Sequence, residues 1–180
     1  VLGLIAAGGG VPDTLSNPQV RLQRGHKIYS TSVEKLYQNP SLDSRLRGGD
    51  KVIVEADDRY FLSLGATGTE AQIPFESSNV SALDAITKAG GISDTRGDPQ
   101  GILILREYPS SAVAAGVRGP RQQRVVFTLD LTNADGLFSA RNFPIHHKDL
   151  VLATESPITN ARTVLQLVGS VFGVANTVTN

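Results

Sequence analysis

An internal repeat is the feature of this sequence that most restricts its fold, because a repeated sequence predicts a repeated folding unit. Three segments recur in the same order: an Ala-Gly-Gly string, a stretch that ends in arginine, and a turn that leads into an apolar stretch. They lie at 7–9, 20–24 and 48–54 in the first copy and at 89–91, 102–106 and 147–152 in the second. The offset between the copies grows from 82 to 99 positions, so the second copy holds 17 additional residues.

The second copy carries the fuller set of secondary-structure signals. Ser81 followed by Asp84 is typical of a capped helix start, and Gly90 predicts the helix end because glycine adopts the left-handed backbone that follows a C-cap. Short apolar or alternating runs predict strands at 60–64, 72–75, 102–105, 126–131 and 147–152. The order strand, strand, helix, strand, strand, strand describes a β-grasp unit, a mixed sheet wrapped on one helix. The first copy begins at its helix and has an extended stretch at 27–36, so it is expected to lack the first hairpin.

Composition and motifs exclude several classes of function. The chain has no cysteine, which excludes disulfides, thiolate metal sites and cysteine nucleophiles. Its 17 basic and 17 acidic residues balance, so the overall basic field of a nucleic-acid-binding protein is absent. Gly8-Gly9-Gly10 lacks the Lys-Ser/Thr of a phosphate-binding loop, and the sequence has no serine elbow or recurring carboxylate pair. We therefore expect neither enzyme activity nor a cofactor.

Two pairs of residues with possible site chemistry are interpreted as structural. Arg24 and Arg106 lie at equivalent strand ends, which favours pairing with a carboxylate or a carbonyl over contact with a ligand. His146 and His147 are adjacent, so in a strand their side chains would point to opposite faces and could not reach one metal ion. The repeat places these histidines in a turn equivalent to 47–48, and no metal site is expected.

The additional residues of the second copy are assigned to a loop at 108–124 that is rich in Ser, Ala, Gly and Pro. This loop carries Arg118, Arg121 and Arg124 and no acidic residue. Three guanidinium groups could bind an anionic polysaccharide or an acidic patch on a neighbouring subunit. The alternative is an ordinary solvated loop, because isolated surface charges usually contribute little. Nucleic acid is not an expected partner, since no aromatic platform alternates with these arginines.

The C-terminal segment 158–180 has the clearest amphipathic pattern. From Thr163 onward it contains no charged residue. On a helical wheel, half of the circumference is apolar, with Val164, Leu165, Leu167, Val168, Val171, Phe172, Val174, Ala175 and Val178. Gly169 and Gly173 lie one turn apart on the small, polar half, which would permit close approach of another helix. Such a helix could pack on its own domain, lie on a membrane surface, or join a ring with lipid outside and a wet lumen inside.

The uncharged polar half favours a pore lining or a subunit contact, because an interfacial helix usually carries Lys or Arg there. A β-grasp unit also offers little free apolar surface beyond its own helix, so we expect the apolar stripe to contact a membrane or another chain. Packing on its own domain remains the alternative, since most amphipathic helices are core elements.

The order of these motifs resembles a known family. The strings 81–86 and 88–91, the strand that ends at Arg106, and the late stretch 148–151 are similar to the SLBB module, a soluble-ligand-binding β-grasp domain. Two such modules followed by a C-terminal amphipathic segment resemble the outer-membrane polysaccharide export proteins of Gram-negative bacteria. That family's N-terminal export domain, signal peptide and lipoprotein cysteine do not occur in the sequence, so we expect the chain to be truncated at its N-terminus.

The resemblance implies an α+β fold of two tandem β-grasp (SLBB-type) modules and a C-terminal amphipathic helix. Their expected bounds are 1–58 for the first, incomplete module, 59–157 for the second, and 158–180 for the helix. By the same resemblance, the protein is a subunit of an outer-membrane channel that exports capsular or exopolysaccharide as a passive conduit. Its implied partners are the polysaccharide, copies of itself in a ring, the outer membrane, and an inner-membrane polysaccharide copolymerase. The alternative is a soluble periplasmic module that binds a saccharide or small ligand and forms no pore.

Overall fold

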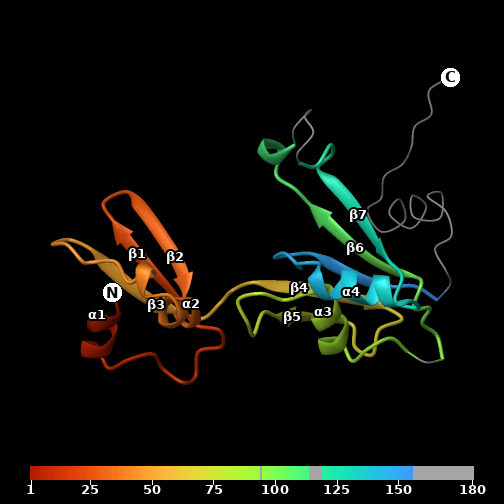
Figure 1. Cartoon of the computed structure of the whole chain (residues 1–180), viewed down its shortest axis with the longest axis horizontal. Helices are drawn as coiled ribbons and strands as arrows, with labels where there is room; N and C mark the ends of the chain where they lie inside the picture. The colour runs from red at the N-terminus through yellow and green to blue at the C-terminus, as the bar shows by residue number, and fades with distance from the viewer. Residues whose placement is uncertain (94, 114–118, 156–180) are drawn as a thin grey trace. The chain divides into compact units, whose positions relative to one another are not determined.

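Two β-sheets accompanied by short helices make up the fold, which the computed structural model describes for residues 1–93, 95–113 and 119–155 (Figure 1). One sheet has three strands and the other has five. The chain divides into two compact units. The first contains Val1–Tyr60 and Pro74–Val80, and the second contains Phe61–Ile73 and the residues from Ser81 onward. The α+β class expected from the sequence is confirmed.

The first unit carries the three-stranded sheet. Its elements are helix α1 (Leu2–Ala7), strands β1 (Gln19–Arg24) and β2 (Lys27–Ser32), helix α2 (Val33–Gln38), the 3-10 turn η1 (Pro40–Leu42) and strand β3 (Lys51–Glu55). The strand order is β2-β1-β3, and both pairs are antiparallel. Val20 of β1 packs with Ile5 of α1 and with Val33 and Leu36 of α2, so both helices contribute to one hydrophobic core.

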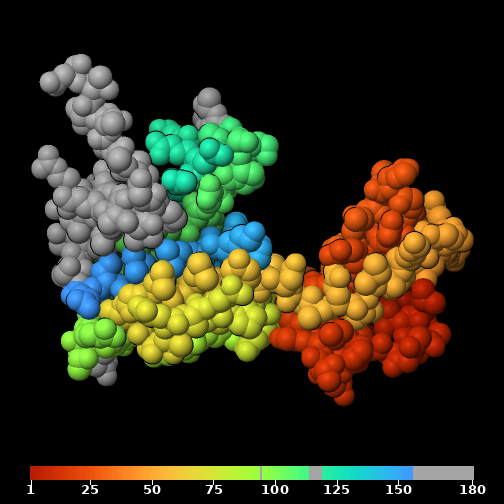
Figure 2. Space-filling view, turned by 180° about the vertical axis from the view of Figure 1, so that it is seen from behind, coloured from red at the N-terminus to blue at the C-terminus, as the bar shows by residue number. Residues whose placement is uncertain are grey.

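The second unit carries the five-stranded sheet. Its elements are strands β4 (Tyr60–Gly65) and β5 (Ala71–Pro74), helix α3 (Ala82–Lys88), strand β6 (Ile102–Glu107), the 3-10 turn η2 (Ser110–Ala112), strand β7 (Arg124–Leu129), helix α4 (Ala134–Asn142) and strand β8 (Leu150–Ala153). The strand order is β5-β4-β8-β6-β7. The sheet is mixed, because β4 and β8 are parallel whereas β6 is antiparallel to both β7 and β8. Figure 2 shows the yellow surface of β4 and β5 beside the blue surface of β8.

The two units repeat the same order of elements. Helix α1, strands β1 and β2, helix α2 and strand β3 correspond to α3, β6, β7, α4 and β8. The strand register also corresponds: Leu22 faces Val52 in the first unit, and Ile104 faces Val151 at the equivalent position of the second. Residues 1–60 contain no counterpart of the strands β4 and β5.

The helix ends of the two units are equivalent, but the predicted pairing of the string 7–9 with 89–91 is wrong by one residue. Two glycines with positive φ follow each helix: Gly9 (101°) and Gly10 (87°), and Gly90 (82°) and Gly91 (80°). The amide of the second glycine donates to a helix carbonyl at 2.9 Å in both units. Gly8 therefore corresponds to Ala89, because the left-handed backbone after the C-cap, and not the identity of the preceding side chain, determines the equivalence.

The structure contains a helix after β2 and after β7 that the sequence patterns do not predict. The extended stretch expected at 27–36 ends at Ser32, whose hydroxyl accepts a hydrogen bond from the Lys35 amide at 3.2 Å and starts α2. The Asn133 side chain starts α4 in the same way by accepting from the Gly136 amide at 2.8 Å. These helices have six and nine residues, so their apolar periodicity is weak and the cap residue is the main signal.

The elements predicted around the first helix of the second unit are confirmed. The Ser81 hydroxyl accepts from the Asp84 amide at 3.1 Å, and the Asp84 carboxylate accepts from the Ser81 amide at 2.9 Å, which completes a capping box at the start of α3. The predicted hairpin forms the adjacent strands β4 and β5. No helix within the described ranges is long and apolar enough to cross a membrane.

Candidate functional site

The arginine-bearing loop is carried by the β6–β7 hairpin of the second unit (Figure 1). The two strands pair from Ile102 opposite Leu129 to Glu107 opposite Arg124. Beyond the strands, the Tyr108 amide donates to the carbonyl of Gln123 at 2.7 Å and extends the ladder by one step. The residues that enter the loop are therefore held close to those that leave it.

An open hollow of about 580 Å³ lies at the base of this loop. Its lining consists of Tyr108, Gly119, Pro120, Arg121, Gln122, Arg124, Val125, Val126 and Phe127. Two of the three arginines predicted to bind an anionic ligand are in this lining, and both are exposed. Arg118 lies outside the described residues, so its part in the site stays a prediction. The structure thus brings Arg121 and Arg124 to one concave surface.

Two aromatic residues of the hollow, Tyr108 and Phe127, are not identified as site residues by the sequence patterns. The sequence pattern places Phe127 at one position of an alternating strand, and it places Tyr108 only at the start of a loop. The signal that could find them is the hairpin register, because Phe127 pairs with Ile104, two residues before Arg106, and Tyr108 lies two residues after it. Apolar rings combined with a few polar or charged groups are typical of ligand-binding pockets.

A buried guanidinium contacts both rings of the hollow. The Arg106 side chain is only 6% exposed, and its guanidinium carbon lies 5.9 Å from the ring centroid of Tyr108 and 5.3 Å from that of Phe127. Its Nη1 atom also donates to the Tyr108 hydroxyl at 3.4 Å. A third ring, that of Phe143, lies 5.3 Å from the same guanidinium and packs edge-on against Phe127. Since these contacts orient the rings, Arg106 is a positioning residue for the hollow.

Asp149 fixes Arg106 in turn. Nε of Arg106 donates to Oδ1 of Asp149 at 2.9 Å, and Nη2 donates to Oδ2 at 2.6 Å and to the Pro144 carbonyl at 2.7 Å. Asp149 is 1% exposed and also accepts from the His146 amide at 2.7 Å. Burial is the largest single influence on the pKa of Arg106 and lowers it, but the hydrogen bonds and charge interactions with Asp149 and Tyr108 together outweigh burial, and the pKa is raised above its ordinary value. Arg106 therefore remains charged inside the unit, with Asp149 as its partner.

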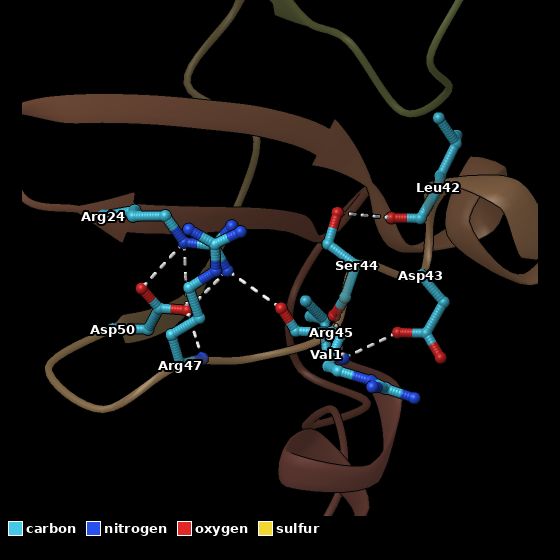
Figure 3. Close-up of polar contacts among 8 residues, drawn as sticks. All are labelled: Val1, Arg24, Leu42, Asp43, Ser44, Arg45, Arg47 and Asp50. Carbon is cyan, nitrogen blue, oxygen red and sulfur yellow. Dashed lines mark hydrogen bonds and ion pairs between the residues drawn. The ribbon is translucent and has the colours of Figure 1, made fainter.

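The first unit contains the same arrangement (Figure 3). Nε of Arg24 donates to Oδ1 of Asp50 at 3.0 Å, and Nη2 donates to Oδ2 at 2.7 Å and to the Arg45 carbonyl at 2.9 Å. The Arg47 amide also donates to Asp50, at 2.8 Å. The hydrogen bond from Arg24 lowers the pKa of Asp50 to about 2. The structural interpretation of the two equivalent arginines is confirmed, since each binds both a carboxylate and a carbonyl.

The turn before each aspartate is shared as well. In both units the aspartate amide donates to the carbonyl three residues earlier at 3.1 Å. The residue just before each aspartate has positive φ, 88° at Gly49 and 70° at Lys148. His146 and His147 therefore lie in the predicted turn, with His146 at the place of Arg47.

The residues predicted for a membrane or oligomer helix lie outside the described residues. They are Val164, Leu165, Leu167, Val168, Gly169, Val171, Phe172 and Gly173. Their role stays a prediction from the amphipathic pattern.

Known proteins are similar to the chain along its whole length. Capsule polysaccharide export protein BexD of Haemophilus influenzae is 30% identical over 189 residues, which cover 100% of this chain and 48% of the relative. Capsule polysaccharide export outer membrane protein CtrA of Neisseria meningitidis is 30% identical over 190 residues, which cover 100% of this chain and 49% of the relative. Vi polysaccharide export protein VexA/TviF of Salmonella typhi is 22% identical over 158 residues, which cover 87% and 43%. The chain spans about half the length of the first two relatives. No family model matches it.

Proposed function

We propose that this chain, a homologue along its whole length of the outer-membrane polysaccharide export proteins, is part of a channel subunit that exports capsular or exopolysaccharide. The observation that carries the proposal is the match of the entire chain to proteins named for capsule polysaccharide export. The proposed location is the outer membrane and periplasm of a Gram-negative bacterium, and the polysaccharide is the transported substrate. The relatives are named as export proteins and not as enzymes, which supports a role without catalysis.

The proposed subunit contains two tandem β-grasp modules of the SLBB type, followed by an amphipathic helix at 158–180. The mixed sheet of the second unit, with parallel β4 and β8 and with α3 in the same unit, supports this assignment. The first unit supports it by repeating five of the second unit's elements in order. Several copies in a ring would surround a conduit, and their C-terminal helices would cross the outer membrane.

The proposed conduit is passive. The glycine-rich string at 8–10 is explained as the end of α1, since Gly9 and Gly10 supply the left-handed backbone that terminates the helix. Among the described residues, this string was the feature closest to a phosphate-binding loop. Energy for export would therefore come from a partner, and an inner-membrane polysaccharide copolymerase is the partner that the family resemblance suggests.

Within this role, the hollow of the β6–β7 hairpin is the proposed contact for the polymer. Arg121 and Arg124, with Arg118 as a third, would pair with carboxylate or phosphate groups of an acidic polysaccharide. The rings of Tyr108 and Phe127 would contact the apolar faces of the sugars. An open, shallow site suits a polymer in transit, because conduction needs binding that is weak enough to permit release.

A soluble periplasmic module that binds a saccharide and forms no pore is the second candidate. The same hollow favours it, because about 580 Å³ is within the usual size of small-ligand sites. In this alternative, Arg121 and Arg124 would hold one bound ligand instead of a moving polymer.

Native mass and membrane fractionation of the full-length protein decide between the candidates. A large ring in the outer-membrane fraction is the expected result for the channel. A monomer recovered entirely in the periplasmic fraction would overturn the channel and favour the binding module.

A further inference from the structure

The five-stranded sheet of the second unit is apolar on both faces. Arg106 of β6 points to one face, where it donates to the carbonyl of Pro144 just beyond α4. Side chains alternate along a strand, so Leu103 and Leu105 point to the opposite face, here called the outer face. One hydrophobic cluster occupies this outer face: Leu62, Leu103, Leu105, Val126, Leu150 and Leu152. All of these cluster members belong to strands, and the described helices contribute none.

The equivalent face of the first unit is more polar, although Ile28 and Ile53 lie exposed on it. The shared register gives three direct comparisons: Arg21 replaces Leu103, Gln23 replaces Leu105, and Lys51 replaces Leu150. Arg21 also forms an exposed ion pair with Glu55 on this face. Because the first unit forms the equivalent sheet with this more polar face, forming the sheet does not require a wholly apolar outer face. Leu103, Leu105 and Leu150 are only 0%, 6% and 7% exposed, although no described helix belongs to their cluster. Because burial of apolar side chains is favourable in proportion to the area removed from water, the outer face is suited to being covered.

Chain continuity indicates which segment covers it. Strand β3 leads within a few residues into β4, whereas β8 leads into the amphipathic segment 158–180. Strand β8 is the middle strand of its sheet, so this segment leaves from the centre of the sheet. A helix of eighteen residues is roughly 27 Å long, and five strands span about 19 Å. The segment is therefore long enough to cross the whole outer face.

We infer that the apolar stripe of segment 158–180 docks on the outer face of its own subunit while the protein is in water. Packing of this segment on its own domain is the alternative that the amphipathic pattern leaves open, and the outer face is the surface on which it would pack. Docking would bury two apolar surfaces that otherwise promote association, and the stripe would reach lipid or a neighbour only after release. This inference goes beyond the proposed channel and does not depend on it, because docking would equally serve a soluble module.

Thiol labelling of the full chain tests the docking, since the sequence has no cysteine of its own. Val168→Cys places a thiol on the apolar stripe, and Ser170→Cys places one on the polar half. In dilute, vesicle-free solution, maleimide should label the Val168→Cys thiol about tenfold or more slowly than the Ser170→Cys thiol, because a docked side chain reacts only when it opens. Adding Leu103→Gln and Leu105→Gln to Val168→Cys should remove this protection. Arg21→Gln, on the equivalent face of the first unit, is the matched control and should leave labelling unchanged.

Three results would overturn the inference. Equal labelling of the two thiols in water would show that the stripe is uncovered. Protection that increases with protein concentration would assign the outer face to a second copy. Protection seen only after adding phosphatidylethanolamine–phosphatidylglycerol vesicles would assign the stripe to the membrane. If the double glutamine variant does not fold, Leu152→Gln on the half-buried edge of the cluster provides the same comparison. None of these results depends on whether the full-length protein forms a channel.

Discussion

At the scale of single residues, the two units share a charged pair that differs mainly in its burial. Arg106 and Asp149 are 6% and 1% exposed, whereas Arg24 and Asp50 are 28% and 3% exposed. Both pairs have the same hydrogen-bond pattern, so the chain contains an internal comparison of one interaction in two environments. Such a comparison separates the effect of burial from the effect of geometry.

Asp149→Asn should destabilise the second unit more than Asp50→Asn destabilises the first. The loss of charge at Asp149 leaves the Arg106 guanidinium buried without its partner, which typically costs about 3–5 kcal/mol. Arg24 is partly hydrated and should lose less. Urea unfolding of both variants measures the difference, with Glu55→Gln in the exposed pair with Arg21 as a control expected to change stability by about 1 kcal/mol or less. Equal losses from the two asparagine variants would contradict the role of burial.

The Asp50 carboxylate should make the stability of the first unit depend on pH in the acid range. Its pKa is about 2 in the folded chain, against about 3.9 for an unperturbed aspartate. Because the folded value is the lower one, the stabilisation is complete above about pH 4 and is lost as the pH falls toward 2. Urea unfolding titrated through this range should show the loss, and Asp50→Asn should lack this part of the slope. A slope that persists in the variant would assign the acid sensitivity to other carboxylates.

Glycine substitutions near the end of α3 should separate backbone strain from steric contact. A Cβ atom at Gly68 would lie 2.6 Å from the carbonyl oxygen of Gly90, so Gly68→Ala should destabilise by about 1–3 kcal/mol through overpacking. Gly91 has open space but a φ of 80°, so Gly91→Ala should lose about 1–2 kcal/mol through the left-handed backbone alone. Gly90→Val combines both effects and should cost about 1 kcal/mol or more.

Thermal and urea unfolding of these variants provides the measurement. Gly3→Ala is the control, because a Cβ there meets nothing within 4 Å and the residue lies inside α1. It should leave stability unchanged or raise it by about 0.5–1 kcal/mol. Losses at Gly68 and Gly91 no larger than at Gly3 would contradict the close approach and the strain.

The role of a single residue can be predicted from the sequence where the repeat supplies an equivalent residue in the other unit. Arg24 and Arg106 were interpretable as structural because two equivalent arginines are improbable ligand contacts, and the turn around His146 followed from its equivalence to Arg47. The pairing of helix ends is off by one because Ala-Gly-Gly is matched by side chains, whereas φ determines the equivalence. Tyr108 and Phe127 escape detection because their proximity arises only from the pairing of β6 with β7.

At the scale of elements, periodicity identifies the long or strongly patterned segments and misses the short ones. The strands of the second unit and helix α3 are predictable from alternation, apolar runs and a capping box. Helices α2 and α4 are not, since six and nine residues give few turns over which an apolar stripe can repeat. Their signals, Ser32 and Asn133, are side chains that also occur commonly in loops.

The β6–β7 hairpin should bind an anionic polysaccharide through its arginines. Replacing Arg121 and Arg124 by Gln, with Arg118→Gln as a third change, should reduce binding several-fold while leaving the fold intact, because the two described arginines are exposed. The difference from the unmodified protein should shrink as salt rises, since exposed charges are screened over about 8–10 Å at physiological ionic strength.

Binding of an acidic polymer at low and high salt measures this effect. Arg141→Gln removes an exposed charge from α4 of the same unit and should change binding little. Unchanged binding of the triple variant at low salt would return the loop to an ordinary solvated surface. If the variant loses as much binding at high salt as at low salt, its arginines contact the polymer in a way that does not depend on their charge.

At the scale of the whole molecule, the resemblance to known proteins was predictable from the order of weak motifs, each too common to identify a protein alone. The relatives confirm the resemblance to polysaccharide export proteins. The two faces of the second sheet were not distinguished, because the continuous apolar run in β6 reads the same whether one face or both are covered. The difference is seen only when the pairing of β6 with β8 is compared with the pairing of β1 with β3. Of the four outer-face leucines in β6 and β8, three then have polar counterparts in the first unit, and the fourth has an isoleucine.

The two halves of the C-terminal segment should respond oppositely to an added charge in the full-length protein. Val168→Asp places a carboxylate on the apolar stripe and should abolish membrane insertion, since Asp near the centre of a bilayer costs about 2.5–3.5 kcal/mol on insertion scales. Ser170→Asp places the same charge on the small, polar half and should be tolerated if that half lines water. The measurements are recovery in the outer-membrane fraction and appearance of polysaccharide at the cell surface.

Comparison of the two variants separates membrane contact from a general effect of charge. If both leave channel formation untouched, the segment does not line a pore, and the channel proposal loses its membrane element. If both abolish it, the polar half is buried in a subunit contact, which the spacing of Gly169 and Gly173 would explain. Val168→Asp should also release the segment from the outer face in water, because the same stripe serves both contacts. Export lost with Val168→Asp and retained with Ser170→Asp is therefore the result that assigns the stripe to lipid after its release from the sheet.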